Sequence, residues 1–195
     1  MRRNQTLHEW LIPALAMETG ATAYLELGCH QNETVSAMPD AMGEGAKIVA
    51  VDINEPVERI HGVNYRIMPT ADYLREWART DGPFDLVFID ADHSARAALS
   101  DFEAVWPYVK PEGLVLLHDT NPDTEADTAP GYCGDSWIVA RYLANKGYES
   151  VTLPYHPGLT LVRKRTSWGP ADSPTPKQAA SEASSDAKDI VDVLR

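Results

Sequence analysis

Cysteine is scarce in this sequence: Cys29 and Cys133 are the only two in 195 residues. Two cysteines without a CxxC spacing predict neither a disulfide framework nor a zinc site, so we expect two reduced thiols. Long apolar runs are also missing, since no stretch approaches the roughly 20 residues that a membrane-spanning helix needs. The apolar stretch 10–17 is short and contains Pro13, which argues against a signal peptide. These absences predict a soluble, cytoplasmic protein.

Basic residues are few as well. The chain has 17 Lys and Arg against 29 Asp and Glu, which gives a formal net charge of −12. Proteins that bind nucleic acid phosphates or anionic membranes usually present a basic face. We therefore expect no nucleic acid partner and no membrane partner. The hydrophobic fraction of 44% is enough for a buried core, but neither number identifies a substrate.

The composition changes after Lys164, where a stretch rich in Ser, Pro and Ala begins. Such a stretch lacks the apolar residues that it would need to fold alone. We therefore expect one folded domain over residues 1–164 and a largely disordered tail over residues 165–195.

Before the tail, short apolar runs typical of strands alternate with segments of helical periodicity. Five such units followed by a two-strand ending predict an α/β open sheet with parallel central strands and an antiparallel C-terminal hairpin. The expected strands are 23–27, 47–51, 63–68, 84–90, 113–119, 150–153 and 159–163. The expected helices are 6–17, 33–42, 71–79, 95–108 and 136–146, with a turn at 110–113.

Two of these apolar runs, 84–90 and 113–119, end on an aspartate. Strands that are apolar on both faces belong in the middle of a parallel sheet, and ligands bind just beyond the carboxyl ends of such strands. We therefore expect Asp90, His118 and Asp119 to lie at one ligand-binding edge. The alternative stays open that Asp90 only caps a turn and that His118 is a hydrogen-bonded histidine without a catalytic task.

The first strand ends at Gly28, and the second strand ends 24 residues later at Asp52. A glycine directly after the first strand lets the chain turn sharply and lets a ligand approach the backbone. An acid at the end of the second strand can accept hydrogen bonds from both hydroxyls of a ribose. A role for Asp52 as a turn or cap residue is the competing interpretation. Asn32 tolerates the left-handed backbone conformation better than most residues do, so it can stand in for a second glycine.

Several segments together resemble the class I S-adenosylmethionine-dependent methyltransferases. They are Tyr24–Gly28, Val49–Asp52, Phe84–Ser94, Asp101–Thr120 and Tyr155–Leu159. The likeness is to a branch of small O-methyltransferases related to catechol, macrolide-sugar and cephalosporin-modifying enzymes, and it covers roughly Leu7 to Lys164. It implies a Rossmann-like, doubly wound, seven-stranded sheet.

The resemblance also implies roles for particular residues. Glu26, Gly28 and Cys29 would border the methionine end of S-adenosylmethionine, and Asp52 would hold its ribose. Thr70 and Ala71 would lie near the adenine. Asp90, which borders the cofactor, and Asp119 match positions that hold a divalent cation in metal-dependent relatives.

Methyl transfer to oxygen needs alignment of two partners and a nucleophilic oxygen. A divalent cation such as Mg²⁺ can lower the pKa of a hydroxyl, and carboxylate oxygens suit that ion. His93 and His118 are the available general bases, because histidine titrates near neutral pH. For His93, a structural role at the start of a helix is as acceptable as a catalytic one.

The sequence therefore predicts a methyltransferase that acts on a hydroxyl of a small molecule, a sugar or a natural-product scaffold, with S-adenosylmethionine as cofactor and a divalent cation as an aid. A homodimer is compatible with this prediction. The loop 119–134 is long enough to form a lid over the acceptor. Two alternatives stay open: a metal-independent methyltransferase with a histidine base, and a non-catalytic cofactor-binding or assembly protein.

Overall fold

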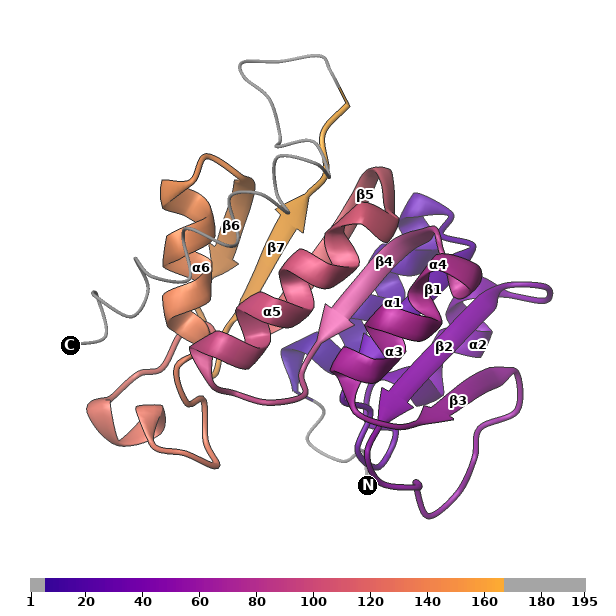
Figure 1. The fold of residues 1–195 in the computed structure, drawn as a ribbon, viewed down its shortest axis with the longest axis horizontal. Helices are drawn as coiled ribbons and strands as arrows, with labels where there is room; N and C mark the ends of the chain where they lie inside the picture. Colours follow the sequence, from indigo (N-terminus) through magenta and orange to yellow (C-terminus); the bar gives the residue numbers. More distant parts are fainter. Residues whose placement is uncertain (1–5, 167–195) are drawn as a thin grey trace.

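A computed structural model describes residues 6–166 of the chain. Its centre is a seven-stranded sheet in the order β3-β2-β1-β4-β5-β7-β6 (Figure 1). The first five strands are parallel, and β5, β7 and β6 pair antiparallel. The strands are β1 (Ala23–Leu27), β2 (Lys47–Asp52), β3 (Val63–Ile67), β4 (Phe84–Ile89), β5 (Val109–His118), β6 (Glu149–Leu153) and β7 (Leu159–Arg163).

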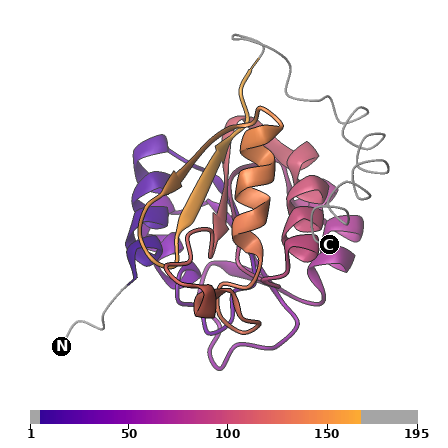
Figure 2. The ribbon, with the colours of Figure 1, turned by 90° about the vertical axis from the view of Figure 1, so that its left-hand side faces the viewer.

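Helices cover both faces of the sheet, as Figure 2 shows when the sheet is viewed along its edge. One layer contains α1 (Leu7–Thr19), the short η1 (Val35–Ala37) and α2 (Met38–Met42). The other contains α3 (Thr70–Glu76), α4 (Ala78–Asp81), α5 (Ala95–Val105), η2 (Trp106–Tyr108) and α6 (Ser136–Asn145). A further short helix, η3 (Glu125–Thr128), lies in the long loop after β5. The predicted doubly wound α/β fold is confirmed.

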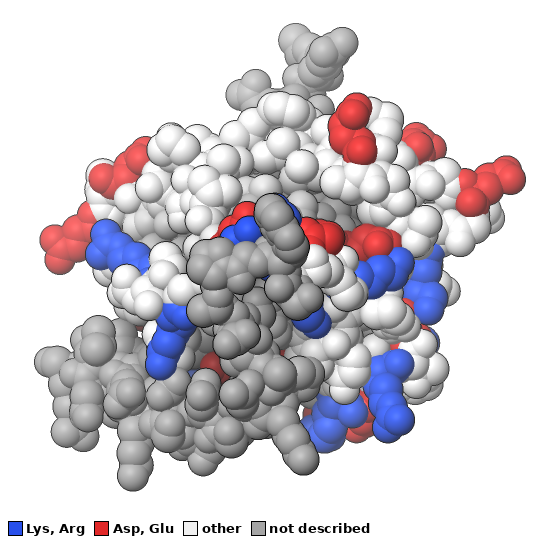
Figure 3. Space-filling model, turned by 90° about the horizontal axis from the view of Figure 1, so that it is seen from above, with Lys and Arg blue, Asp and Glu red and all other residues white. Residues whose placement is uncertain are grey.

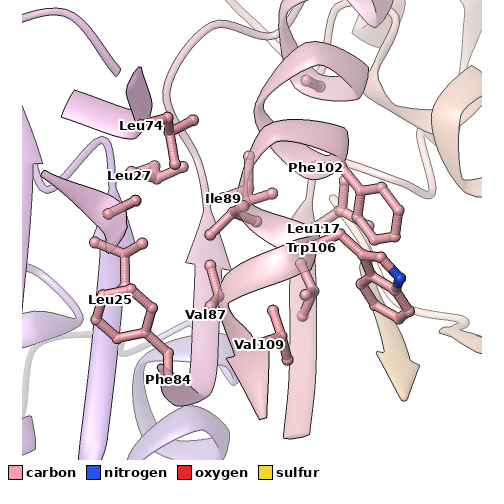
Figure 4. Packing of buried hydrophobic residues seen from close by; sticks show 14 of the residues in the cluster. Leu25, Leu27, Leu74, Phe84, Val87, Ile89, Phe102, Trp106, Val109 and Leu117 are labelled. Atoms are coloured by element: carbon pink, nitrogen blue, oxygen red, sulfur yellow. The ribbon is translucent and has the colours of Figure 1, made fainter. Parts of the chain in front are cut away.

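The apolar strands divide their side chains between two cores, one for each layer. Leu25, Val87 and Phe102 belong to the core under α3, α5 and α6, which Figure 4 shows from close by. Tyr24 and Phe88 point to the other face and pack with Ile12 of α1. Because neighbouring residues of a strand face opposite sides, a central strand with two covered faces is buried along its whole length. The burial of all five residues of β1 fits this rule.

The expected helix 71–79 is divided into α3 and α4 at Trp77. Trp77 itself is 37% exposed and lies at the surface. Its ring lies under the guanidinium of Arg66, which forms an ion pair with Asp81. Arg66 stacks on the indole ring while Asp81 holds its charge, and this cation–π contact stabilises Trp77 at the surface.

The expected turn at 110–113 is also wrong, because these residues belong to β5. The pairing of β4 with β5 shifts register between Phe84 and Leu86, and Glu112 has a positive φ of 66°. Pro111 and Gly113 gave the signal of a turn, but here they accompany a bulge, which inserts residues without ending the strand. The backbone N–H of Glu112 pairs with the carbonyl of Lys164 at 2.6 Å.

Apart from Arg165 and Thr166, the predicted tail lies outside the described residues. Within residues 6–166, no helix is both long and apolar enough to span a membrane.

Candidate active site

A cavity of about 800 Å³ lies at the carboxyl ends of the parallel strands. Residues that follow β1, β2, β4 and β5 line it, together with the first turn of α1 and part of the loop after β5. Strand order reverses direction between β1 and β4, which is where open α/β sheets bind their ligands. Nine of the predicted site residues line this one cavity: Glu26, Gly28, Cys29, Asp52, Thr70, Asp90, His93, His118 and Asp119.

Gly28 is required by a close approach between two turns. Its φ is 89°, and a Cβ at this position would lie 2.2 Å from the carbonyl oxygen of Asp90. Its backbone N–H donates to the carbonyl of Val51 at 2.8 Å. The glycine therefore lets the ends of β1, β2 and β4 converge on the cavity.

The rest of this loop is held by Asn32, which has the predicted positive φ, at 69°. Its buried side chain donates to the carbonyl of Glu58 at 2.7 Å and accepts from the hydroxyl of Tyr65 at 2.9 Å. Asn32 thus ties the loop after β1 to the segment after β2. A glycine could not make these hydrogen bonds.

Asp52 stands at the end of β2, on the rim of the cavity. Its Oδ2 accepts from the backbone N–H of His30 at 2.9 Å, and its Oδ1 accepts from that of Asn54 at 2.8 Å. The residue therefore has the turn role considered from the sequence. Each carboxylate oxygen has further acceptor capacity, so this role does not exclude a contact with a ribose.

Glu26 is a buried carboxyl group, 2% exposed, inside the sheet. Burial raises its pKa to about 8, although the hydroxyl of Tyr24 donates to its Oε2 at 2.7 Å and opposes the shift. Cys29 is buried next to it along the cavity wall, and burial raises the pKa of its thiol to about 12. Burial therefore favours the protonated form of both groups.

The two residues expected near an adenine differ in position. Thr70 lines the cavity, and its hydroxyl donates to Oδ1 of buried Asp101 at 3.0 Å. Ala71 is exposed and does not line the cavity, because it follows Thr70 on the first turn of α3, where the next residue points in another direction.

Asp90, His93 and Asp119 converge as a group that can hold a metal ion. One potential ligand atom from each lies within 4.8 Å of the others. His93 Nδ1 is 3.1 Å from Asp119 Oδ2, and His93 Nε2 is 3.7 Å from Asp90 Oδ1. The same Nδ1 is in contact with the carbonyl oxygen of Tyr132. His93 therefore lies close to both of the predicted aspartates.

His118 lies beside this group and is mostly buried. Its Nδ1 is 3.0 Å from Asp90 Oδ1 and 3.4 Å from Asp119 Oδ1. Burial by itself lowers the pKa of His118, but the two carboxylates outweigh it and raise that pKa to about 10. The histidine is thus an imidazolium that holds both aspartates in place at neutral pH.

Two parts of the cavity wall were missed by the sequence reasoning. His8 and Glu9 of α1 line the cavity, and the rings of His8 and His118 are 4.1 Å apart. Burial, followed by the charge of His118, lowers the pKa of His8 to about 4. Tyr132 and Cys133 of the loop after β5 also line it. The first helix is nearly apolar, so its pattern did not show which polar residues would face the sheet.

The cavity wall has an unusual charge distribution. Among the described residues that line it there are seven acidic residues and five of the six histidines of the chain, but no Lys or Arg. The acidic residues are Glu9, Glu26, Glu33, Asp52, Asp90, Asp92 and Asp119. Such a wall favours a positively charged ligand.

An open α/β sheet with a cavity at its switch point, an acid at the end of β2 and polar groups after β4 and β5 defines a Rossmann-like fold with a candidate cofactor site. The chain belongs to the methyltransferase domain family, whose model matches residues 22–120. The prediction of an S-adenosylmethionine-dependent methyltransferase of the small O-methyltransferase branch is confirmed.

Relatives and solved structures agree with this assignment. The chain is 26% identical to the caffeoyl-CoA O-methyltransferase of Citrus natsudaidai over 166 residues, which cover 73% of this chain and 71% of that protein. An O-methyltransferase from Bacillus cereus in complex with SAH has the same fold, with a TM-score of 0.66, 16% identity, and coverage of 83% of this chain and 85% of that one. The MycE methyltransferase of the mycinamycin pathway, in complex with Mg and SAH, also has this fold, with a TM-score of 0.58 and 20% identity. The match covers 81% of this chain and 49% of the MycE chain.

Proposed function

We propose that this protein transfers the methyl group of S-adenosylmethionine to a hydroxyl of a small molecule, a sugar or a natural-product scaffold. A divalent cation at Asp90, His93 and Asp119 assists it. The observation that carries the proposal is the single cavity in which Asp52 lies on one rim while Asp90 and Asp119 come together at the ends of neighbouring strands.

The cofactor would occupy the part of the cavity after β1 and β2. When bound, S-adenosylmethionine supplies a methyl group on a positively charged sulfur. Asp52 would accept from its ribose hydroxyls, and Glu26 would face its methionine end as a carboxylate, because a nearby positive charge lowers the pKa of an acid. Cys29 and Thr70 would border the methionine end and the adenine, respectively. The acidic wall fits this cationic cofactor.

The acceptor would lie near Asp90, His93 and Asp119. The donor set of two carboxylates and one imidazole, within 4.8 Å, fits a divalent cation. When bound, such a cation lowers the pKa of a hydroxyl that it contacts. Asp90 and Asp119 would hold it, and the hydrogen bonds from His118 would keep their carboxylates in position.

A metal-independent reaction is the second candidate, because His93 is itself a base at the cavity wall. It is one-third exposed and can reach an acceptor. His118 fits a catalytic base less well, because an imidazolium with a raised pKa cannot accept a proton. We therefore assign proton removal to His93 and a positioning role to His118.

The sequence further predicts a cytoplasmic enzyme, compatible with a homodimer, that has neither nucleic acid nor membranes as partners. The formal net charge of −12 supports the last two points.

Calorimetry with S-adenosylhomocysteine, with and without Mn²⁺, tests the proposal. We expect micromolar cofactor binding, and Mn²⁺ binding that falls at least about tenfold in Asp119→Asn, because a neutral amide replaces a charged ligand. Asp92→Asn removes an equal charge from the same wall outside the metal group and serves as the control. Absence of S-adenosylhomocysteine binding would contradict the proposed function. Methyl transfer that survives EDTA but is lost in His93→Ala would favour the metal-independent alternative.

A further inference from the structure

A second cavity, of about 410 Å³, lies beside the loop after β5. It is lined by loop residues between Thr120 and Thr128, by Trp137, Ala140 and Arg141 of α6, and by Thr152 of β6. This second cavity and the active-site cavity have no lining residue in common, although the same loop contributes to both. Small-molecule sites usually have volumes of about 300–1,000 Å³, so the second cavity is large enough for a ligand.

Arg141 gives the second cavity a cation without an anionic partner. Its guanidinium lies over the ring of Trp137, one helical turn away on α6, at 4.6 Å from the ring centroid. Within residues 6–166 it forms no ion pair and no hydrogen bond. The N–H groups of a guanidinium point outward in its plane, so stacking on an indole leaves them available for a carboxylate or phosphate.

Many other cationic side chains of the described chain already have acidic partners. Ion pairs join Arg59 to Glu55, Arg66 to Asp81, Arg75 to Asp72, Lys110 to Asp85 and Arg163 to Glu112. Figure 3 shows the end of the molecule where the parallel strands begin, and Lys and Arg side chains there lie beside Asp and Glu side chains. Arg141 differs from these residues, because the group that it contacts is an uncharged ring.

The second cavity also has hydrogen-bond donors without acceptors. Thr160 Oγ1 donates to Thr120 Oγ1 at 2.8 Å, and Thr152 Oγ1 is 2.8 Å from Thr160 Oγ1. A threonine hydroxyl has one hydrogen, so Thr152 is the donor in the second pair. The hydroxyl hydrogen of Thr120, a residue that is 6% exposed, then has no acceptor within residues 6–166.

The indole Nε1 of Trp137 is likewise buried without a hydrogen-bond partner among the described residues. Buried donors in folded proteins normally have acceptors. Unpaired donors on Thr120, Trp137 and Arg141 around one cavity therefore point to an occupant that is rich in acceptor atoms.

The charges around the second cavity favour an anion more than those around the active site do. Glu125 is the one acidic residue among its described lining residues, and it is exposed, so water and salt screen its charge. An anion at Arg141 would meet a stacked cation and hydroxyl donors. In the active-site cavity it would meet seven acidic residues and no Lys or Arg from residues 6–166.

We propose that the second cavity binds a small anionic ligand, which presents a carboxylate or phosphate group to Arg141 and an acceptor atom to the hydroxyl of Thr120. This site is separate from the places of S-adenosylmethionine and of the methyl acceptor. The inference goes beyond the proposed methyltransferase function and does not depend on it.

A matched ligand series tests this site. Glucose 6-phosphate and gluconate carry the two anionic groups, and glucose is neutral. Calorimetry at pH 7, without divalent cations and with S-adenosylhomocysteine at saturating concentration, gives the affinity for each compound. We expect at least one anion to bind with a Kd below about 1 mM and at least about tenfold more tightly than glucose. Added salt should weaken this binding, and a preference for one anion identifies the group that the site accepts.

Arg141→Gln removes the cation and should weaken anion binding about tenfold or more. Arg141→Lys keeps the charge but loses the planar pair of donors, so it should weaken binding less, about threefold. Arg79→Gln, which removes an equal charge from the exposed surface of α4, is the matched control and should change no affinity. Arg141 and Arg79 are both exposed, so the fold should survive in all three variants.

Four outcomes would overturn the inference: unchanged anion binding in Arg141→Gln, an equal loss in Arg79→Gln, glucose that binds as tightly as the anions, or no binding of either anion at millimolar concentration. Failure of the proposed function is a different result, because S-adenosylhomocysteine would then not bind while the anions could still be measured in its absence.

Discussion

The Cα of Gly28 packs against the backbone of Asp90, so that a Cβ on Gly28 would lie 2.2 Å from the Asp90 carbonyl oxygen. This contact joins the loop that would meet the cofactor to the residue that would meet the acceptor. A change at Gly28 should therefore disturb both ends of the cavity together.

Gly28→Ala should lower the free energy of unfolding by about 2–4 kcal/mol, because it adds a backbone clash to the strain of a positive φ. It should also abolish binding of S-adenosylhomocysteine. Gly20→Ala is the matched control, since Gly20 has a φ of 65° but nothing within 4 Å of its Cβ position. Urea denaturation of both variants gives the comparison. If both variants lose the same free energy of unfolding, backbone strain alone explains the loss and the contact with Asp90 has no effect.

The buried carboxyl group of Asp101 should make the stability of the protein depend on pH. It is 4% exposed, and burial raises its pKa to about 6, against the hydrogen bond from Thr70. Because the unfolded chain loses this proton near pH 4, the folded protein binds more protons between about pH 4 and 6. The contribution of Asp101 to stability is therefore present at low pH and is lost as the pH rises through 6.

Asp101→Asn should remove this dependence, because the amide oxygen can still accept from Thr70 but carries no charge. We expect the variant to gain on the order of 1–3 kcal/mol over the native protein at pH 8 and much less at pH 4. Urea denaturation at both pH values measures the difference. Parallel stability profiles for the two proteins would refute the assignment.

Much of the fold and part of the site follow from strand patterns. The runs that end at Asp52, Asp90 and Asp119 are apolar enough to specify central strands, and parallel strands place their carboxyl ends at one edge. Sequence reasoning therefore found these acids. It could not find Glu9, because α1 is apolar almost all round and its orientation is set by packing against the sheet.

Other features depend on tertiary contacts that local patterns do not encode. Tyr132 reaches the cavity because the next glycine, Gly134, packs on His93, where a Cβ would lie 2.5 Å from the His93 carbonyl oxygen. The bulge in β5 has the composition of a turn but is held in the sheet by pairing with Lys164. Ala71 fails as a site residue because one step along a helix rotates a side chain away from the cavity.

Asp52→Asn should weaken S-adenosylhomocysteine binding about tenfold, because a charged acceptor for the ribose hydroxyls becomes a neutral group with a single acceptor oxygen. The fold should survive, since the amide oxygen can retain one of the two backbone contacts. Asp40→Asn on the exposed surface of α2 removes an equal charge far from the cavity and should have no effect. Calorimetry measures the affinity of each protein for S-adenosylhomocysteine. If Asp52→Asn and the native protein bind it equally well, Asp52 has only a structural role in the turn.

His93→Gln should lower kcat by about 10²–10⁴ if His93 removes the acceptor proton, while the affinity for S-adenosylhomocysteine stays within about twofold. The reason is geometric: His93 stands beside Asp90 and Asp119, and the cofactor residues Glu26 and Asp52 follow other strands. His156→Gln, which changes another histidine of the same wall, should retain most activity. A kcat that falls together with the affinity for Mn²⁺ would instead assign His93 to holding the cation, because loss of a ligand weakens metal binding.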